Sequence, residues 1–161
     1  MTPRLLALLL LATPASADIR SACAEAPSFD EALAELRMDG WEAQDRDSAF
    51  SVDQTDALAW TLVIPDLTGD SGGESPEALL DLQRASVPGL LLRRDTDTTK
   101  SRVLLQGDHA LTIVQTRLLP GRVQRACRVA MADAVEGLEV IETDGAPRLA
   151  QIIAVLPEVD R

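Results

Sequence analysis

Apolar residues follow a helical period near the start of the chain. From residue 29 they recur at positions i, i+3, i+4 and i+7, and Ser28 and Glu31 form the Ser-x-x-Glu pattern of a capping box. We therefore predict a helix that begins at Ser28 and ends at Gly40, with Trp41 packed against the same core. The buried stripe of this helix consists of Phe29, Ala32, Leu33 and Leu36.

Two further segments favour helices. Ser75-Pro76-Glu77 is typical of a helix start, because the backbone N–H that Pro lacks has no partner at the first helical position. The buried face predicted for this helix consists of Ala78, Leu79, Leu82 and Ala85. A third helix is predicted near residues 147–156, with Pro157 at its end. Its apolar residues at helical spacing are Leu149, Ile152, Ile153 and Leu156.

Other segments alternate between apolar and polar or small residues, which is the period of a half-buried strand. Residues 50–64 show this alternation, so we predict two strands joined by a turn at 53–56, with Pro65 stopping the second strand. Short strands are also predicted at residues 90–92 and 138–142.

The longest β region lies between residues 103 and 131. Gly107-Asp108 separates the strands predicted at 103–106 and 109–119, and Gly at the first central position suits a two-residue hairpin. Pro120-Gly121 predicts a second turn. The strand that follows, 122–131, directs Cys127 inward because Cys127 shares one face with apolar neighbours.

These elements predict an α+β fold with a mainly antiparallel sheet of about five to seven strands and about three helices packed on it. Residues 18–161 form a single domain in this interpretation. The one long linker-like segment, at residues 66–74, separates groups of elements that are too small to fold alone.

The first seventeen residues have the pattern of a cleavable export signal. Arg4 supplies a positive charge, residues 5–11 are apolar, and Ala15-Ser16-Ala17 has the small-x-small pattern that signal peptidase requires. The apolar run is too short to span a bilayer. We therefore expect cleavage after Ala17, a periplasmic or secreted product, and no stable membrane anchor after cleavage.

The chain contains two cysteines, Cys23 and Cys127. In an oxidising compartment such a pair forms a disulfide, so we predict a Cys23–Cys127 bond. Redox-active pairs have Cys-x-x-Cys spacing, which this pair lacks. The bond is therefore expected to be structural, and closing a loop of this size stabilises the fold by about 4.7 kcal/mol in the chain-entropy model.

The formal net charge is −11, from 26 acidic and 15 basic residues. Such a surface repels phosphate backbones and anionic lipid. We therefore expect neither nucleic acid nor a membrane surface as a partner, whereas basic protein faces, cationic peptides and divalent cations remain open.

One glycine-rich segment resembles a catalytic motif. Gly69-Asp70-Ser71-Gly72-Gly73 is similar to the nucleophile segment of chymotrypsin-like serine proteases, a family in which the histidine base precedes the serine. The single histidine, His109, follows Ser71 in this chain. A surface loop is therefore the interpretation that we favour for this segment.

A second segment, Asp95-Thr96-Asp97-Thr98-Thr99, is similar to the Asp-x-Asp-x-Thr motif of haloacid dehalogenase-type phosphatases. Too few residues follow it for the parallel sheet of that family, so we favour a polar turn, with a loosely held Ca²⁺ ion as an alternative. A transition-metal site at His109 would need further ligands, and we expect His109 at the surface. We assign no catalytic residue, resident metal or cofactor.

Three functions remain open. We favour a small acidic exported module that is not an enzyme and that binds a protein or peptide partner. The alternatives are a hydrolase built on carboxylates such as Asp95 and Asp97, and a carrier of a small apolar ligand. Carboxylates with raised pKa values in a cleft would favour the hydrolase, a deep cavity the carrier, and a partly apolar surface the binding module.

Overall fold

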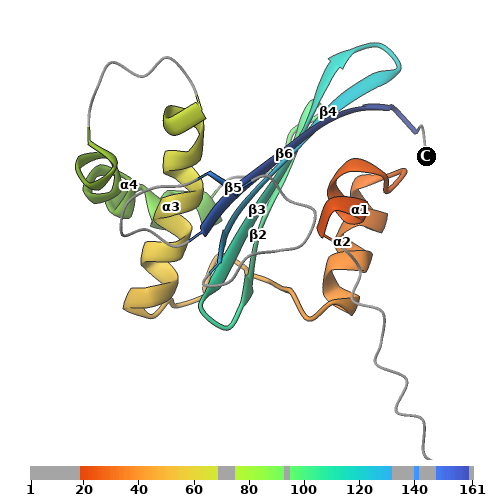
Figure 1. The fold of residues 1–161 in the computed structure, drawn as a ribbon. Helices are drawn as coiled ribbons and strands as arrows, with labels where there is room; N and C mark the ends of the chain where they lie inside the picture. The colour runs from red at the N-terminus through yellow and green to blue at the C-terminus, as the bar shows by residue number, and fades with distance from the viewer. Residues whose placement is uncertain (1–18, 69–74, 93–94, 132–139, 142–147, 160–161) are drawn as a thin grey trace, which may run out of the picture.

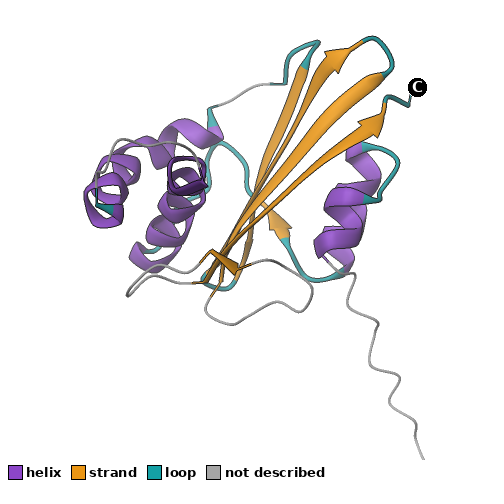
Figure 2. Ribbon diagram, turned by 45° about the horizontal axis from the view of Figure 1, so that its top comes forward, coloured by secondary structure: helices purple, strands orange, loops and turns teal. Residues whose placement is uncertain are grey.

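In the computed structural model, one antiparallel sheet lies between two layers of helices (Figures 1 and 2). The structure describes residues 19–68, 75–92, 95–131, 140–141 and 148–159. This architecture confirms the predicted α+β class. The helices are α1 (Ile19–Ala24), α2 (Phe29–Met38), α3 (Val52–Thr68) and α4 (Pro76–Leu91). The strands are β1 (Glu42–Ala43), β2 (Thr99–Gln106), β3 (His109–Leu119), β4 (Arg122–Met131), β5 (Val140–Ile141) and β6 (Arg148–Pro157).

The strands lie in the order β1-β2-β3-β4-β6-β5, and each neighbouring pair is antiparallel. The two predicted hairpins are confirmed: Gln106 pairs directly with His109 across Gly107-Asp108, and Leu119 pairs with Arg122 across the second turn. Gly107 has a φ of +60° and Gly121 a φ of +78°, a region that favours glycine.

Each face of the sheet has its own core. Helices α1 and α2 pack on one face, with Leu104, Leu111, Ile113, Cys127 and Val129 of the sheet. Helices α3 and α4 pack on the other face, with Val103, Leu105, Ala110, Ala130 and Leu149. Neighbouring strand residues alternate between the two cores, as the period of two requires.

The predicted disulfide is present. Cys23 in α1 and Cys127 in β4 are bonded, 104 residues apart in sequence, with 6.1 Å between their Cα atoms. Cys127 is fully buried, as predicted. The bond holds α1, a short helix that the sequence pattern did not predict, against the middle of the sheet.

Helix α2 begins as the capping box predicts. The Ser28 hydroxyl oxygen accepts the Glu31 backbone N–H at 3.2 Å, and the same hydroxyl donates to the Glu31 carboxylate at 2.7 Å. Trp41 follows the helix and is 1% exposed, which confirms its place in the core. All four residues of the predicted stripe are buried, namely Phe29, Ala32, Leu33 and Leu36.

The prediction of two strands at residues 50–64 is wrong, because this segment lies largely within helix α3. Helix α3 packs between the sheet and α4, so it is buried on more than one side (Figure 1). Five consecutive residues, 57–61, are buried, and Val63 and Ile64 are buried as well. In a helix surrounded in this way, apolar residues no longer mark a single stripe, and the apparent alternation carries no information on the period. Pro65 lies in the last turn of α3.

The predicted helix at Ser75 is confirmed, but it extends to Leu91, so the strand predicted at residues 90–92 is wrong. Its buried face also differs from the prediction. Leu82 is 63% exposed, and Ala78 and Ala85 are exposed. The residues that α4 buries are Leu79, Leu80, Val87 and Leu90.

The helix predicted near residues 147–156 is wrong as well, because Arg148–Pro157 forms strand β6 along the full length of β4. Its apolar residues alternate between the two faces of the sheet. The run Leu-Ala-Gln-Ile-Ile-Ala-Val-Leu fits this strand period as well as it fits the helical period. Of the strand predicted at 138–142, the structure describes Val140–Ile141 as β5.

The export signal predicted at residues 1–17 and the glycine-rich segment at 69–73 lie outside the described residues. Within the described ranges, none of the helices combines the length and the apolar character needed to cross a bilayer.

Candidate functional site

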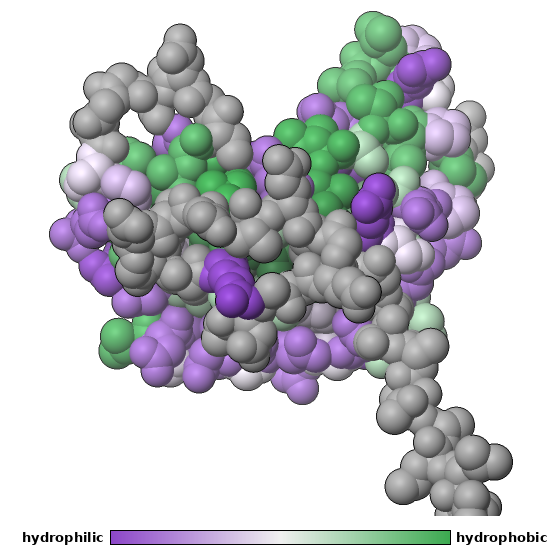
Figure 3. All heavy atoms as spheres, in the orientation of Figure 1, coloured by the Kyte–Doolittle hydropathy of each residue, from purple (hydrophilic) through white to green (hydrophobic). Residues whose placement is uncertain are grey.

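Helices α3 and α4 cover only one end of their face of the sheet. The sheet residues in their core lie close to the Gly107-Asp108 hairpin or to β5. Toward the opposite end, β3, β4 and β6 extend past both helices (Figures 1 and 2). Figure 3 shows apolar side chains on this projecting part, beside a hollow that separates it from the helices.

The projecting part carries a continuous set of apolar residues. Val114 of β3, Ala126 of β4 and Ile153 of β6 are direct neighbours in register. Ile153 and Val155 are each 52% exposed, and Leu119, the last residue of β3, pairs with the first residue of β4 and is 67% exposed. We call this surface the outer sheet face and define it by Val114, Leu119, Ala126, Ile153 and Val155. Branched apolar side chains that are half exposed on one strand face are typical of an interaction surface.

The outer sheet face differs in charge from the rest of the chain. The described positions on this face of β2, β3, β4 and β6 include no Asp or Glu, although the net charge of the chain is −11. The charged residues that alternation places there are Arg122 and Arg128. Arg128 donates its Nε–H to the side-chain oxygen of Gln151, its neighbour on β6, at 3.2 Å.

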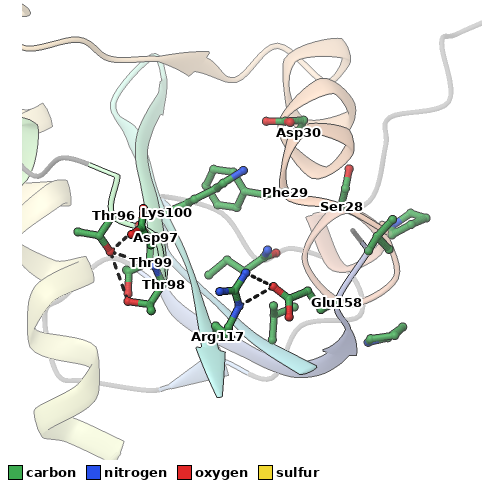
Figure 4. Close-up of a pocket in the computed structure, with 15 residues that line it drawn as sticks. Ser28, Phe29, Asp30, Thr96, Asp97, Thr98, Thr99, Lys100, Arg117 and Glu158 are labelled. Carbon is green, nitrogen blue, oxygen red and sulfur yellow. Dashed lines mark hydrogen bonds and ion pairs between the residues drawn. The ribbon is translucent and has the colours of Figure 1, made fainter. Parts of the chain in front are cut away.

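A cavity of about 280 Å³ lies on the other side of the sheet, between the start of α2, the start of β2 and the end of β6 (Figure 4). Its charged lining residues are Asp30, Asp97, Lys100, Arg117 and Glu158. Arg117 donates its Nε–H to Glu158 at 2.6 Å, and the two form an ion pair. This lining of both charge signs does not match an apolar carrier, whose ligand would need apolar walls.

The two carboxylates of the hydrolase alternative have different surroundings. Asp97 lines the cavity, whereas Asp95 receives two hydrogen bonds from Arg102, at 2.7 and 2.8 Å, and one from the Ser101 backbone N–H at 3.2 Å. The hydrogen bonds from Arg102 are the main cause that holds the pKa of Asp95 below its ordinary value. An acid catalyst needs a raised pKa, so the surroundings of Asp95 do not suit acid catalysis. Its hydrogen bonds instead hold Asp95 against the start of β2.

Arg102 is held in turn by the helix layer. Its guanidinium lies 5.8 Å from the centre of the Phe29 ring, within cation–π range. The Asp95–Arg102 pair therefore connects β2 to the first residue of α2.

Asp56 and Arg84 form a second pair, between α3 and α4. Arg84 donates to both carboxylate oxygens, at 2.7 and 3.0 Å, and these hydrogen bonds lower the pKa of Asp56. His109 stands at the start of β3 and is half-buried. Among the described residues, no three His, Cys, Asp or Glu side chains are grouped so that they would hold a metal ion.

Arg125 has a role that the sequence pattern did not predict. This residue interrupts the apolar face of β4 and is 0% exposed. Its Nη1 donates to the backbone carbonyls of Ala22 and Ala26, at 3.0 and 2.8 Å, while Nε and Nη2 both donate to Gln115 Oε1. Burial lowers the pKa of Arg125. A charged residue inside an apolar strand pattern was the available signal, and its function is to fix α1 on the sheet beside the disulfide.

No protein-family model, curated protein or solved structure matches this chain. The role of the outer sheet face is therefore inferred from its own chemistry.

Proposed function

We propose that this chain is an exported module, closed by one disulfide, that binds a protein partner through the outer sheet face. The supporting observation is the row of branched apolar side chains that α3 and α4 leave uncovered, above all Ile153 and Val155 at 52% exposure. Covering such side chains would remove apolar surface from water, which is the main favourable term in protein association.

The charges on the face define the partner further. Arg122 and Arg128 flank the apolar row, and no carboxylate lies on the described positions of this face. A complementary partner presents apolar side chains with carboxylates beside them. The arginines would fix the orientation of the partner, and the apolar row would supply most of the affinity.

Export is part of the proposal. It is supported by the signal pattern at residues 1–17 and is compatible with the Cys23–Cys127 bond, because disulfides persist in oxidising compartments.

Site-specific photo-crosslinking tests the proposal in a cell that naturally produces the chain. A photoreactive residue is placed at Leu119 on the outer sheet face or, as the matched control, at Leu82 on α4; these positions are 67% and 63% exposed. We expect a discrete crosslinked protein from position 119 and none from position 82.

The captured partner is then purified, and its affinity is measured for three forms of the protein. We expect Leu119→Lys to weaken binding at least about tenfold relative to wild type, which is about 1.4 kcal/mol, and Leu82→Lys to leave it unchanged. Equal crosslinking at both positions, or equal affinity of the two variants, would overturn the proposal.

A further inference from the structure

The polar cavity has a floor made by neighbouring strands of the sheet. Lys100 of β2 and Gln115 of β3 are direct partners in register, so their side chains leave the same face of the sheet about 5 Å apart. Both line the cavity, as do Arg117, two residues further along β3, and Val123, its partner on β4. The start of α2 and the segment before β2 form walls at the sides (Figure 4). The outer sheet face lies on the opposite side of the same strands, so the cavity is separate from the proposed partner site.

The buried Arg125 fixes the orientation of the Gln115 side-chain amide. Nε and Nη2 of Arg125 both donate to Gln115 Oε1, at 3.0 and 2.8 Å. Because an arginine side chain has only donors, the amide must turn its oxygen toward Arg125 and its NH₂ group away. Gln115 Nε2 makes no hydrogen bond within the described ranges, and it is not one of the fully buried polar atoms. Two N–H donors at the cavity are thus held in place without an acceptor.

Lys100 adds a positive charge beside these donors. It is the only lysine in the chain, and it forms no hydrogen bond or ion pair with the residues that the structure describes. An ammonium group beside a primary amide is complementary to a carboxylate, because each donor group can bind one carboxylate oxygen. The pair therefore favours a ligand that places a carboxylate at this end of the cavity.

The rest of the lining limits which carboxylate fits. Three lining residues are acidic, namely Asp30, Asp97 and Glu158, and the chain carries a net charge of −11, so a ligand with a net negative charge is disfavoured. Asp97 forms no hydrogen bond or ion pair among the described residues, and its carboxylate can accept an ammonium group. Pro27 and Val123 add apolar surface. The volume of about 280 Å³ lies at the lower end of the range for ligand pockets, so the ligand is small.

We propose that this cavity binds a free amino acid with an apolar side chain, in its zwitterionic form. Lys100 Nζ and Gln115 Nε2 bind the carboxylate of the ligand, and Asp97 accepts its ammonium group. Arg125 is a positioning residue, because it directs Gln115 Nε2 toward the cavity without touching the ligand. The inference goes beyond the proposed function, since the site takes a small molecule and lies on the other face of the sheet.

Three related compounds test the two charges of the ligand separately. L-leucine carries both charges, L-leucinamide lacks the carboxylate, and N-acetyl-L-leucine lacks the ammonium group. Each is titrated into the oxidised protein lacking residues 1–17, and NMR follows the side-chain NH₂ signals of Gln115 and the methyl signals of Val123. We expect saturable shifts of both residues with L-leucine and at least about tenfold weaker binding of the other two compounds. No shift at about 20 mM L-leucine, or equal affinity for L-leucine and either derivative, would overturn the proposal.

Gln115→Glu tests the oriented amide and leaves Arg125 with an acceptor. The second carboxylate oxygen replaces the two N–H donors, so this variant should fold and bind L-leucine at least about tenfold more weakly. Gln124→Glu is the matched control, because Gln124 is also half-buried and lies on the neighbouring strand, but on the opposite face of the sheet. It should leave the affinity for L-leucine unchanged. Equal losses in the two variants would contradict the assigned role of Gln115.

Lys100→Met tests the ammonium group. It should weaken L-leucine binding at least about tenfold without weakening L-leucinamide binding, because L-leucinamide has no carboxylate for Lys100 to bind. A purely structural role of Lys100 would weaken the binding of both compounds and would contradict the proposal.

Leu119→Lys separates the cavity from the partner site. This variant should weaken partner binding and leave the affinity for L-leucine unchanged, whereas Lys100→Met should do the reverse. Loss of both kinds of binding in either variant would contradict two independent sites.

Discussion

Arg125 on β4 and Gln115 on β3 lie directly opposite each other, and Nε and Nη2 of Arg125 both donate to Gln115 Oε1, at 3.0 and 2.8 Å. The remaining nitrogen reaches two carbonyls at the end of α1. A fully buried guanidinium thus has only neutral acceptors in direct contact, and it substitutes for the water that these acceptors would otherwise bind.

The first prediction concerns this buried group. Arg125→Met should lower the free energy of unfolding by about 2–4 kcal/mol, because two buried carbonyls and the half-buried Gln115 lose their donor. Arg122→Met, on the same strand but exposed, should change it by less than about 0.5 kcal/mol. Denaturant unfolding of the oxidised proteins measures both values. Equal values for the two variants would contradict the assigned role of Arg125.

The second prediction concerns the pH dependence of the Asp95–Arg102 pair. Hydrogen bonds from Arg102 hold the pKa of Asp95 below 3.8, its ordinary value. A lowered carboxyl pKa contributes stability that is present above the unfolded pKa and is lost as pH falls through the folded pKa. Wild type should therefore melt at a higher temperature than Asp95→Asn at about pH 6, and this difference should shrink below about pH 4. A difference that stays constant from about pH 6 to about pH 2 would contradict the pairing.

The third prediction concerns the disulfide. Replacing Cys23 and Cys127 by alanine should lower the free energy of unfolding by about 2–5 kcal/mol, because the bond closes a loop of 104 residues. Chemical unfolding of the oxidised wild type and the double variant measures the difference. Equal unfolding midpoints for the two proteins would show that the bond contributes nothing.

The fourth prediction concerns processing. Expressed in full in a Gram-negative host, the chain should appear in the periplasm with Asp18 as its first residue and a mass two hydrogens below the dithiol form. Intact mass spectrometry of the cell fractions measures both. A cytoplasmic product that retains Met1 would contradict the export proposal and leave the disulfide without an oxidising compartment.

Local chemistry explains which elements could be predicted from the sequence. The Ser28 cap, the Gly107 turn and the Cys23–Cys127 pair each depend on a side-chain property that acts wherever the residue stands. For segments without such a marker, the hydrophobic period is the only signal in the sequence, and it can fit both a helix and a strand. Residues 149–156 fit both periods, and only pairing with β4 makes them a strand.

The outer sheet face could not be predicted for a related reason. Whether Ile153 and Val155 are exposed depends on how far α3 and α4 reach along the sheet, and the pattern of residues 50–64 predicts strands where α3 lies. Without α3, no helix is available to cover one end of the face and leave the other open. Burial at this site is a property of the tertiary arrangement, which a hydrophobic pattern does not record.

Methyl NMR tests the central proposal most directly, because it reports all surfaces at once. The protein is titrated with the purified partner that crosslinking identifies. We expect shifts at the methyl groups of Val114, Leu119, Ile153 and Val155, and none at Leu82 on α4 or at Val123, which lines the polar cavity. Shifts at Val123, with the outer sheet face unchanged, would contradict the account and move the binding site to the opposite side of the sheet.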